Sequence, residues 1–264
     1  MQVELSYLTT FLLVSLGIAP LMTNTLFLAR NALYFKCYVL SFSAVALGIL
    51  LNINFLVATW PAFCLFGLLL YLKKTGLKCL DLNAFVSVIP FVFSVIASIW
   101  LVAGVYDIRL LGYNKLWSFY AALHGNHLGW LLVGCLAYLA QRRTSRFYVY
   151  ACYICFVSFL LIALGIDGVP YIKQIGVIFM TVTVPCSILF YFLKLKGEQK
   201  IPKVLSGLSL FGVLVTMLLA VVKEFGGFSP FQFMGAGGMV SIHGLINSLI
   251  VTPCFFIAVL KSDG

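Results

Sequence analysis

The sequence predicts an all-α fold: a polytopic bundle of about nine transmembrane helices, with residues 1–264 forming a single integral membrane domain. The chain is 63% hydrophobic and 9% charged, and its mean hydropathy is +1.11. A soluble domain is roughly 45–50% apolar and about 25% charged. Apolar segments of about 20 residues recur between short charged loops, as helices that cross a bilayer require.

The apolar runs predict the helices in chain order. The first run has no positively charged segment before it and no cleavage box after it, so we expect a retained span and not a signal peptide. The second and third runs are separated only by Asn52 and Asn54, and the count falls to eight if they form one span. The predicted ranges are 5–29, 36–52, 54–72, 82–104, 117–140, 147–165, 171–193, 203–223 and 238–260.

Basic residues divide unequally between the two sets of loops. The odd-numbered loops and the C-terminal tail hold thirteen Lys and Arg residues, whereas the even-numbered loops hold four, Arg109, Lys115, Lys173 and Lys223. Cytoplasmic loops carry the excess of Lys and Arg. We therefore expect the N-terminus outside and the C-terminus in the cytoplasm, with the chain in the plasma membrane. Because the net charge of +10 falls at helix ends, no nucleic-acid partner is predicted.

The fifth predicted helix carries polar residues where lipid is expected. Its stretch WSFYAALHGNHLGWLLVGCL contains His124, Asn126 and His127, and polar side chains at such depth usually mark a functional site. Tyr120, His124 and His127 follow the spacing i, i+4, i+7 of one helix stripe. At 1.5 Å per residue, the two histidines lie roughly 10–15 Å below the outer end.

The ninth predicted helix places His243 and Asn247 at a similar depth, roughly 7–14 Å from its outer end. All three histidines of the chain are therefore predicted in the outer half of the membrane. Small residues flank both stripes and allow close helix approach in lipid. We infer that the fifth and ninth helices share a polar cavity, with acidic residues of the outer loops and the N-terminus above it. The glycines are Gly125, Gly129, Gly235, Gly237, Gly238 and Gly244, and the acids are Glu4, Asp107, Asp167 and Glu224.

Metal and redox chemistry find less support in the sequence. Three histidines can hold zinc, but no carboxylate or thiolate is predicted at their depth, so no metal and no cofactor is expected. The cysteines map mainly to the inner half of the membrane, where they fit small buried hydrophobes. A redox or metal role for Cys152 and Cys155, spaced i, i+3, is the alternative.

Two motifs resemble those of YndJ-like membrane proteins. The segment SGLSLFGVLVTMLLAVVKEFGG followed by MVSIHGLINSL is similar to the family's C-terminal end, with His243, Gly244 and Asn247 in its His-Gly-x-x-Asn motif. AALHGNHLGW is similar to a second family segment, which has a His at the position of His124 and a Gly-aromatic pair at 129–130. The resemblance spans most of the chain and implies no established activity. His127 lies outside the family pattern.

The two HG-containing helices also suggest an internal repeat. Helices two to five and six to nine have the same alternation of direction, and each set ends in a helix with a His-Gly pair, at His124 and at His243. A parallel duplication of four helices, preceded by one extra helix, is one interpretation. Inverted repeats, which are the usual mark of secondary transporters, are not evident.

Three functions remain open from the sequence. The favoured one is a small intramembrane enzyme for isomerisation, cyclisation or hydrolysis of an isoprenoid-like or lipid-like substrate. His124 and His243 would act as general acid and base, while Asn247 would orient an oxygen or a histidine, and Tyr120 and His127 would complete the set. The alternatives are a transporter or proton-coupled carrier using the same histidines, and a structural or assembly subunit with the histidines as interhelical hydrogen-bonding groups. The expected partners are the lipid bilayer and a lipophilic small molecule, with the oligomeric state left open.

Overall fold

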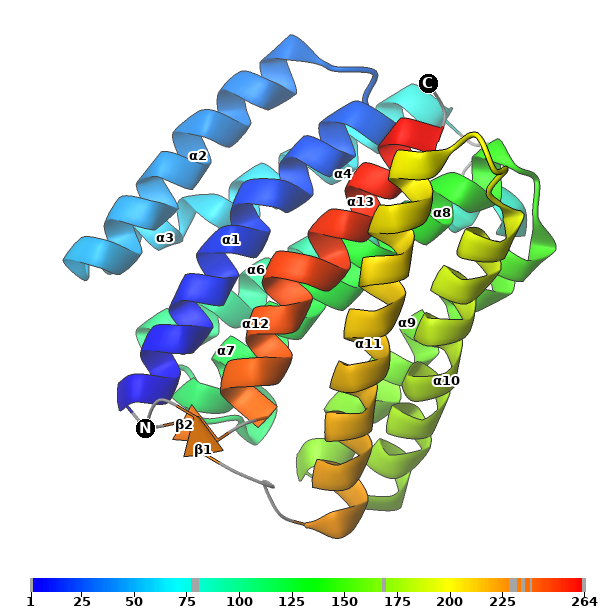
Figure 1. Cartoon of the computed structure of the whole chain (residues 1–264). Coiled ribbons are helices and arrows are strands. Elements are labelled where there is room, and N and C mark those ends of the chain that lie inside the picture. Colours follow the sequence, from blue (N-terminus) through cyan, green and yellow to red (C-terminus); the bar gives the residue numbers. More distant parts are fainter. Residues whose placement is uncertain are drawn as a thin grey trace. The chain divides into compact units, whose positions relative to one another are not determined.

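The computed structural model describes residues 2–76, 81–167, 170–227, 232–233, 236–237 and 239–262. These residues are helical almost throughout, apart from one antiparallel pair, β1 (Gln232–Phe233) and β2 (Ala236–Gly237). Among them, eight helices are long and apolar enough to cross a membrane: Glu4–Leu26, Ala32–Leu51, Asn54–Thr75, Ile89–Tyr106, Arg146–Ile166, Tyr171–Lys194, Lys200–Gly226 and Ser241–Ser262. The predicted all-α fold of a multi-pass membrane protein is confirmed (Figure 1).

The chain divides into two compact units, which are described separately. The N-terminal unit is Leu12–Arg143, and the C-terminal unit combines Met1–Phe11 with Thr144–Gly264. Helix α1 (Gln2–Leu26) contributes residues to both units. The division between them falls just after the first HG-containing helix, where the suggested internal repeat also divides.

The N-terminal unit holds the helices from α2 to α8 together with most of α1. Their bounds are α2 (Ala32–Leu51), α3 (Asn54–Val57), α4 (Thr59–Thr75), α5 (Leu82–Phe85), α6 (Ile89–Tyr106), η2 (Leu110–Gly112), α7 (Lys115–His124), η3 (Gly125–Leu132) and α8 (Val133–Arg142). Helix α6 contacts α4 on one side and the α7–η3–α8 segment on the other, so it lies at the centre of this unit.

The apolar run across Asn52 is two antiparallel helices, as the nine-helix count predicts. Asn52 ends α2 in the left-handed conformation, with φ of 56°, which asparagine tolerates better than most residues. Gly48 packs beside Val57, and Gly67 packs beside Tyr34, so α3 and α4 run back along α2. A Cβ at either glycine would lie 2.9 Å from its neighbour, which accounts for glycine at both positions.

The predicted helix 82–104 is wrong at its start. The membrane-length helix α6 begins at Ile89, and residues before it form only the single turn α5. Pro90 fits a helix start at this point, because proline has no N–H to donate to a preceding helical turn. Proline is tolerated in the first helical turn, where it stands in α6.

The segment Lys115–Arg142 is the ninth long helical stretch among the described residues. Its backbone stays in the right-handed helical region through α7, η3 and α8. It is not among the eight helices that are apolar enough to span a membrane. His124, Asn126 and His127 lie within it and lower its hydropathy.

The C-terminal unit is a meander of four long helical segments. They are α9 (Arg146–Asp167), α10 (Pro170–Lys194), α11 (Lys200–Gly226) and a composite segment of η4 (Met239–His243), α12 (Gly244–Ile246), η5 (Asn247–Val251) and α13 (Thr252–Ser262). Helix α10 packs on α9 and α11, and α11 packs on the composite segment. This order matches that of the last four segments of the N-terminal unit, in which α4 precedes α6 and the first HG-containing segment.

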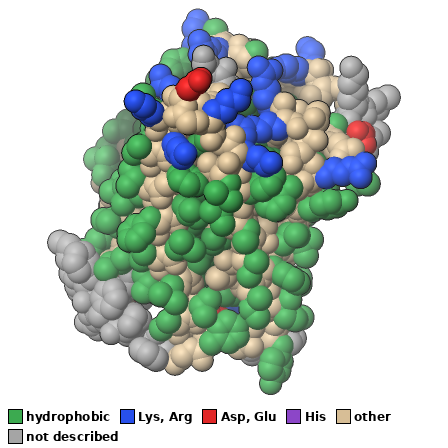
Figure 2. Space-filling model, turned by 45° about the vertical axis from the view of Figure 1, so that its right-hand side comes forward, with side chains coloured by type: hydrophobic (Ala, Val, Ile, Leu, Met, Phe, Trp, Pro, Cys, Tyr) green, Lys and Arg blue, Asp and Glu red, His purple; other side chains and the backbone are tan. Residues whose placement is uncertain are grey.

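Large apolar side chains cover the outer faces of the helices. Leu40 in α2 is 72% exposed and Phe211 in α11 is 70% exposed, which suits contact with lipid. Figure 2 shows hydrophobic side chains over much of the visible face, with Lys and Arg side chains gathered in one part of it. This distribution agrees with a membrane-embedded chain, whereas the predicted orientation of its termini stays a prediction.

Candidate functional site

The predicted polar residues of the fifth helix lie at a change of helix type. Helix α7 ends at His124, and the π-helix η3 follows from Gly125 to Leu132. π-Helical turns are rare and occur often at functional sites. The wider turn disturbs the usual i, i+4 backbone pairing, and Asn126 Nδ2 donates to the Ala122 carbonyl oxygen at 2.8 Å.

Two glycines seat this π-helix on α6. A Cβ at Gly125 would lie 2.8 Å from the Cβ of Ala97, and one at Gly129 would lie 2.2 Å from the Phe93 ring. The predicted close approach at Gly125 and Gly129 is therefore made with α6. The side chains of Asn126, His127 and Trp130 are at least nine-tenths buried in the same segment.

His124 is held by its own helix. Its Nδ1 lies 2.8 Å from the backbone oxygen of Tyr120. Because a carbonyl oxygen only accepts, Nδ1 carries the proton and Nε2 carries the basic lone pair of the neutral ring. Of the predicted stripe, Tyr120 and His124 are thus joined by a hydrogen bond and are half-buried, whereas its third member, His127, is buried. The Tyr120 ring lies 5.6 Å from that of Trp117.

A buried polar cluster surrounds Trp130. The indole Nε1 donates to Thr23 Oγ1 at 2.6 Å, and the ring centroid lies 6.3 Å from that of Trp60. Three buried atoms near these residues in the chain lack a hydrogen-bond partner: Asn24 Oδ1, Trp60 Nε1 and Asn126 Oδ1. Leaving such a group unpaired costs about 1–3 kcal/mol. These atoms can therefore form hydrogen bonds with a polar ligand or with water.

Sequence reasoning missed the partners that complete this cluster. Thr23 and Asn24 lie in the first predicted helix and Trp60 in the third. The available signal was the run Met-Thr-Asn-Thr at residues 22–25, where three consecutive polar side chains interrupt an apolar helix. Local spacing does not show that this run meets Trp130, since the contact joins residues 107 positions apart.

In the C-terminal unit, Thr216 of α11 holds both residues of the predicted motif. His243 Nδ1 lies 3.0 Å from the Thr216 backbone oxygen, and Asn247 Oδ1 lies 3.3 Å from Thr216 Oγ1. The same hydroxyl also lies 3.1 Å from the Val213 carbonyl oxygen. Thr216 has no exposed surface. His243 therefore carries its proton on Nδ1, as His124 does.

This motif also lies in π-helical backbone. The π-helix η4 ends at His243, and η5 begins at Asn247. Hydroxyl groups bond to the carbonyl oxygens there: Thr252 Oγ1 to Asn247 O at 2.9 Å, and Ser209 Oγ to Val251 O at 2.8 Å. Such side-chain bonds are the usual means of satisfying a disturbed helix backbone in lipid.

Thr216 belongs to a small-residue face of α11 that sequence analysis did not single out. Ser206, Ser209, Gly212 and Thr216 are all buried along it. A Cβ at Gly212 would lie 3.0 Å from Val251, so this face packs closely on the composite segment. The spacing of small and hydroxyl residues at i, i+3, i+6 and i+10 was the signal that could have identified Thr216.

The predicted set of His124, His243 and Asn247 is distributed between the two units. The structure describes each motif in its own unit, so the common cavity stays a prediction. Of the predicted outer acids, Glu224 forms an ion pair with Lys173 at 2.8 Å. Gly235, Gly238 and the side chain of Asp167 lie outside the described residues, as does Cys79.

No group of three or more His, Cys, Asp or Glu side chains that could hold a metal ion occurs among the described residues. Cys152 and Cys155 are buried in α9 and are not joined by a disulfide. The polar groups of the two motifs and of the cluster around Trp130 are imidazole, amide, indole and hydroxyl groups.

A sequence model of the YndJ-like protein family matches residues 10–251, which is most of the chain and includes both π-helical motifs. The chain belongs to the YndJ-like family. No curated protein and no solved structure was found to match it. For this YndJ-like protein, the hydrogen bonds of His124 and His243 are thus the most direct guide to chemistry.

Proposed function

We propose that this YndJ-like protein is an intramembrane enzyme that applies histidine acid–base chemistry to a lipophilic, isoprenoid-like or lipid-like substrate. The observation that carries the proposal is the arrangement of His243 and Asn247 on Thr216. An imidazole, an amide and a buried hydroxyl, held together by two helices, form a small preorganised polar site. Such sites in membrane helices are usually functional because their burial is costly.

The tautomer of His243 suits proton transfer. Nδ1–H is fixed on a backbone carbonyl, so Nε2 is the nitrogen that takes up or releases a proton. A backbone oxygen cannot take the Nδ1 proton, and it also stabilises the imidazolium form by accepting that bond. A positioned general base or acid of this kind accelerates a reaction by roughly 10²–10⁴-fold.

Asn247 and Thr216 have positioning roles in this proposal. Thr216 anchors the imidazole through its backbone and the amide through its hydroxyl, so the two groups keep a fixed relation. The amide would then orient a substrate oxygen next to Nε2. An isomerisation or cyclisation needs only such proton transfers, and a hydrolysis needs a water molecule in addition.

His124 is the second proton-transferring group of the proposal. It has the same tautomer, set by the Tyr120 carbonyl oxygen. Tyr120 and Trp117 provide an aromatic surface beside it, and aromatic faces stabilise cationic intermediates. His127 is buried in the adjoining π-helix, in the same segment as Trp130.

The test is a comparison of membrane lipids from a bacterial host that expresses either the wild-type chain or His243→Gln at equal abundance. Mass spectrometry should show one lipophilic compound depleted and one enriched only with the wild-type chain. Equal masses would indicate isomerisation or cyclisation, and a difference of one water would indicate hydrolysis. Identical lipid profiles at equal protein abundance would overturn the enzyme proposal.

A proton-coupled carrier is the second candidate, and the paired π-helical segments favour it. Internal repeats with altered helices are typical of transporters, and both HG-containing segments change between α- and π-helix at the histidine. Reconstituted protein should then move protons across vesicle membranes, measured with an enclosed pH-sensitive dye, and His243→Gln should stop this flux. A structural subunit predicts neither result, and predicts instead that His243→Gln lowers protein abundance.

A further inference from the structure

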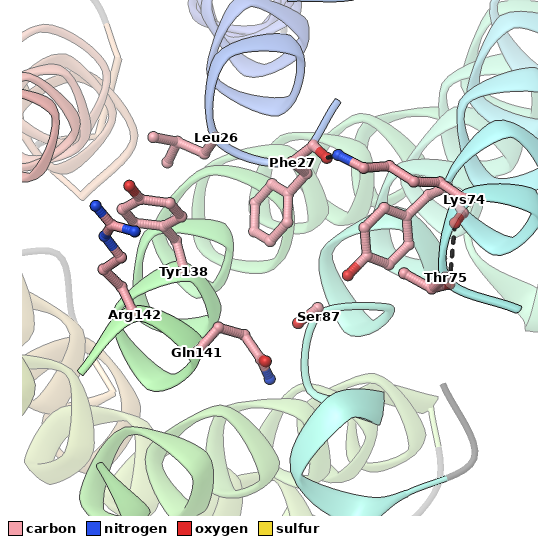
Figure 3. Close-up of a pocket in the computed structure, with 9 residues that line it drawn as sticks. Leu26, Phe27, Lys74, Thr75, Ser87, Tyr138, Gln141 and Arg142 are labelled. Atoms are coloured by element: carbon pink, nitrogen blue, oxygen red, sulfur yellow. Dashed lines mark hydrogen bonds between the residues drawn. The ribbon is translucent and has the colours of Figure 1, made fainter. Parts of the chain in front are cut away.

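A pocket of about 290 Å³ lies in the N-terminal unit, and its lining includes no residue of either histidine motif. It is formed where α1, α4 and α8 end and just before α6 begins, so four segments contribute to its wall. Figure 3 shows Phe27, Ser87, Tyr138 and Gln141 around the central space, with Lys74 and Arg142 at its edge. Its volume is at the lower end of the range for ligand pockets, which suits a small polar group.

The charge of this pocket is positive. Lys74 and Arg142 are its charged lining residues, and the lining includes no carboxylate among the residues that the structure describes. Lys74 Nζ donates to the Phe27 backbone oxygen at 2.9 Å, which fixes the ammonium at the rim. An ammonium has three donors, so this bond uses one of them.

Neutral groups complete a wall that can donate hydrogen bonds. The Ser87 hydroxyl and the Tyr138 ring belong to the lining, and Gln141 is tied to the Asn83 carbonyl oxygen through Nε2. Phe27 packs edge-on against Tyr138 at 6.4 Å between ring centroids and against Tyr71 at 5.9 Å. The aromatic packing gives the pocket a rigid base below its cationic rim.

We propose that this pocket binds the phosphate group of an anionic ligand. Lys and Arg form strong charge-assisted hydrogen bonds with phosphate oxygens, and a hydroxyl can bond a third oxygen. Basic pockets between transmembrane helices near the membrane surface typically bind anionic lipid headgroups. A phospholipid headgroup and free phosphate share this chemistry, and the ligand's acyl chains would remain outside a space of about 290 Å³.

The chain provides matched controls for this proposal. Lys73 is next to Lys74 at the end of α4, and Arg143 is next to Arg142 at the end of α8, but neither Lys73 nor Arg143 lines the pocket. Replacing each by Gln removes the same charge from the same helix end. A general attraction of cations to an anionic membrane would respond equally to both pairs.

The experiment uses the purified full-length chain in a neutral detergent, titrated separately with short-chain phosphatidylglycerol, short-chain phosphatidylcholine and inorganic phosphate. We expect the Lys74→Gln/Arg142→Gln variant to weaken binding of the anionic lipid at least about tenfold, while Lys73→Gln/Arg143→Gln changes it less than about twofold. Binding of the anionic lipid alone would identify a headgroup site, and equal binding of inorganic phosphate would identify a phosphate site.

Equal effects of the two double variants, or no binding of either anionic probe by the wild-type chain, would overturn the proposal. If loss of the Lys74 bond to Phe27 prevents folding, Arg142→Gln and its control Arg143→Gln carry the same test. A melting curve of each variant establishes folding. Because the pocket lining includes no residue of either histidine motif, failure here leaves the enzyme proposal unaffected.

Discussion

The two HG-containing segments use the same local design but hold their histidines in different ways. In both, imidazole Nδ1 donates to a backbone carbonyl oxygen and a π-helix adjoins the His-Gly pair. His124 bonds to Tyr120 in its own helix, four residues earlier. His243 bonds to Thr216 in another helix, 27 residues away. The bond of His243 therefore depends on helix packing, whereas this bond of His124 forms within one helix.

The asparagines of the two segments differ as well. Asn247 Oδ1 is paired with the Thr216 hydroxyl, whereas Asn126 Oδ1 is buried without a partner. The C-terminal motif is thus satisfied within the protein, and the N-terminal cluster has hydrogen-bonding capacity left over. In the proposed reaction, Asn126 Oδ1 of the N-terminal cluster could accept a hydrogen bond from a polar group of the substrate. His243 of the C-terminal motif could transfer the proton.

The largest expected effect tests whether the two histidines act on one substrate. We expect His124→Gln and His243→Gln each to lower substrate conversion by about 10²–10⁴-fold. If they act together, the double variant should be about as inactive as either single variant, because catalytic groups that act as a unit are not additive. Initial rates of the lipid conversion measure this. Two losses that multiply in the double variant would show that the two motifs work independently.

The next effect concerns the packing of η3 on α6. Gly129→Ala should destabilise the protein by about 3 kcal/mol, since the new Cβ would lie 2.2 Å from the Phe93 ring. Gly207→Ala in α11 is the control, because its Cβ would lie at an ordinary 3.5 Å from Phe192, and alanine is the better helix former. Thermal melting in one detergent compares the two. Similar melting temperatures would show that η3 adjusts without cost.

Much of the fold could be predicted because hydropathy and charge act locally. Nine long helical segments among the described residues follow the apolar runs, including the separation of α2 from α3 at Asn52. The start of α6 was predicted too early, although Pro90 marked it. The helical spacing also placed Tyr120 and His124 on one stripe, and the structure connects them through a backbone bond.

The partners of the polar residues could not be predicted, because they come from helices far away in the chain. Thr216 for His243 and Thr23 for Trp130 depend on which helix faces pack together. The π-helical turns were also not predicted, because apolar runs indicate helices through the 3.6-residue period of the α-helix. A period of that kind does not reveal an inserted wide turn.

A smaller effect separates the two bonds made by Thr216. Thr216→Val keeps the backbone bond to His243 but removes the hydroxyl from buried Asn247 Oδ1, so we expect a loss of about 1–3 kcal/mol. Thr216→Ser retains the hydroxyl and should therefore be more stable than Thr216→Val. It should remain somewhat less stable than the wild type, because it lacks one buried methyl group. Thermal melting measures the stability, and ¹⁵N NMR of the histidine ring should still show Nδ1 protonated in Thr216→Val. A changed tautomer in that variant would show that the side chain, and not the carbonyl, fixes His243.

The smallest expected effect decides whether the asparagines differ as their hydrogen bonds suggest. Asn247→Leu removes a satisfied bond and should cost about 1 kcal/mol. Asn126→Leu removes the bond to Ala122, but it also removes the unpaired Oδ1. Because the two effects offset each other, the free energy of unfolding should stay within about 0.5 kcal/mol of that of the wild type. Because the two substitutions are identical, the difference in melting temperature reports only the surroundings. Equal losses would mean that Asn126 Oδ1 is already bonded by water in the resting protein, and that the N-terminal cluster holds no spare acceptor for a substrate.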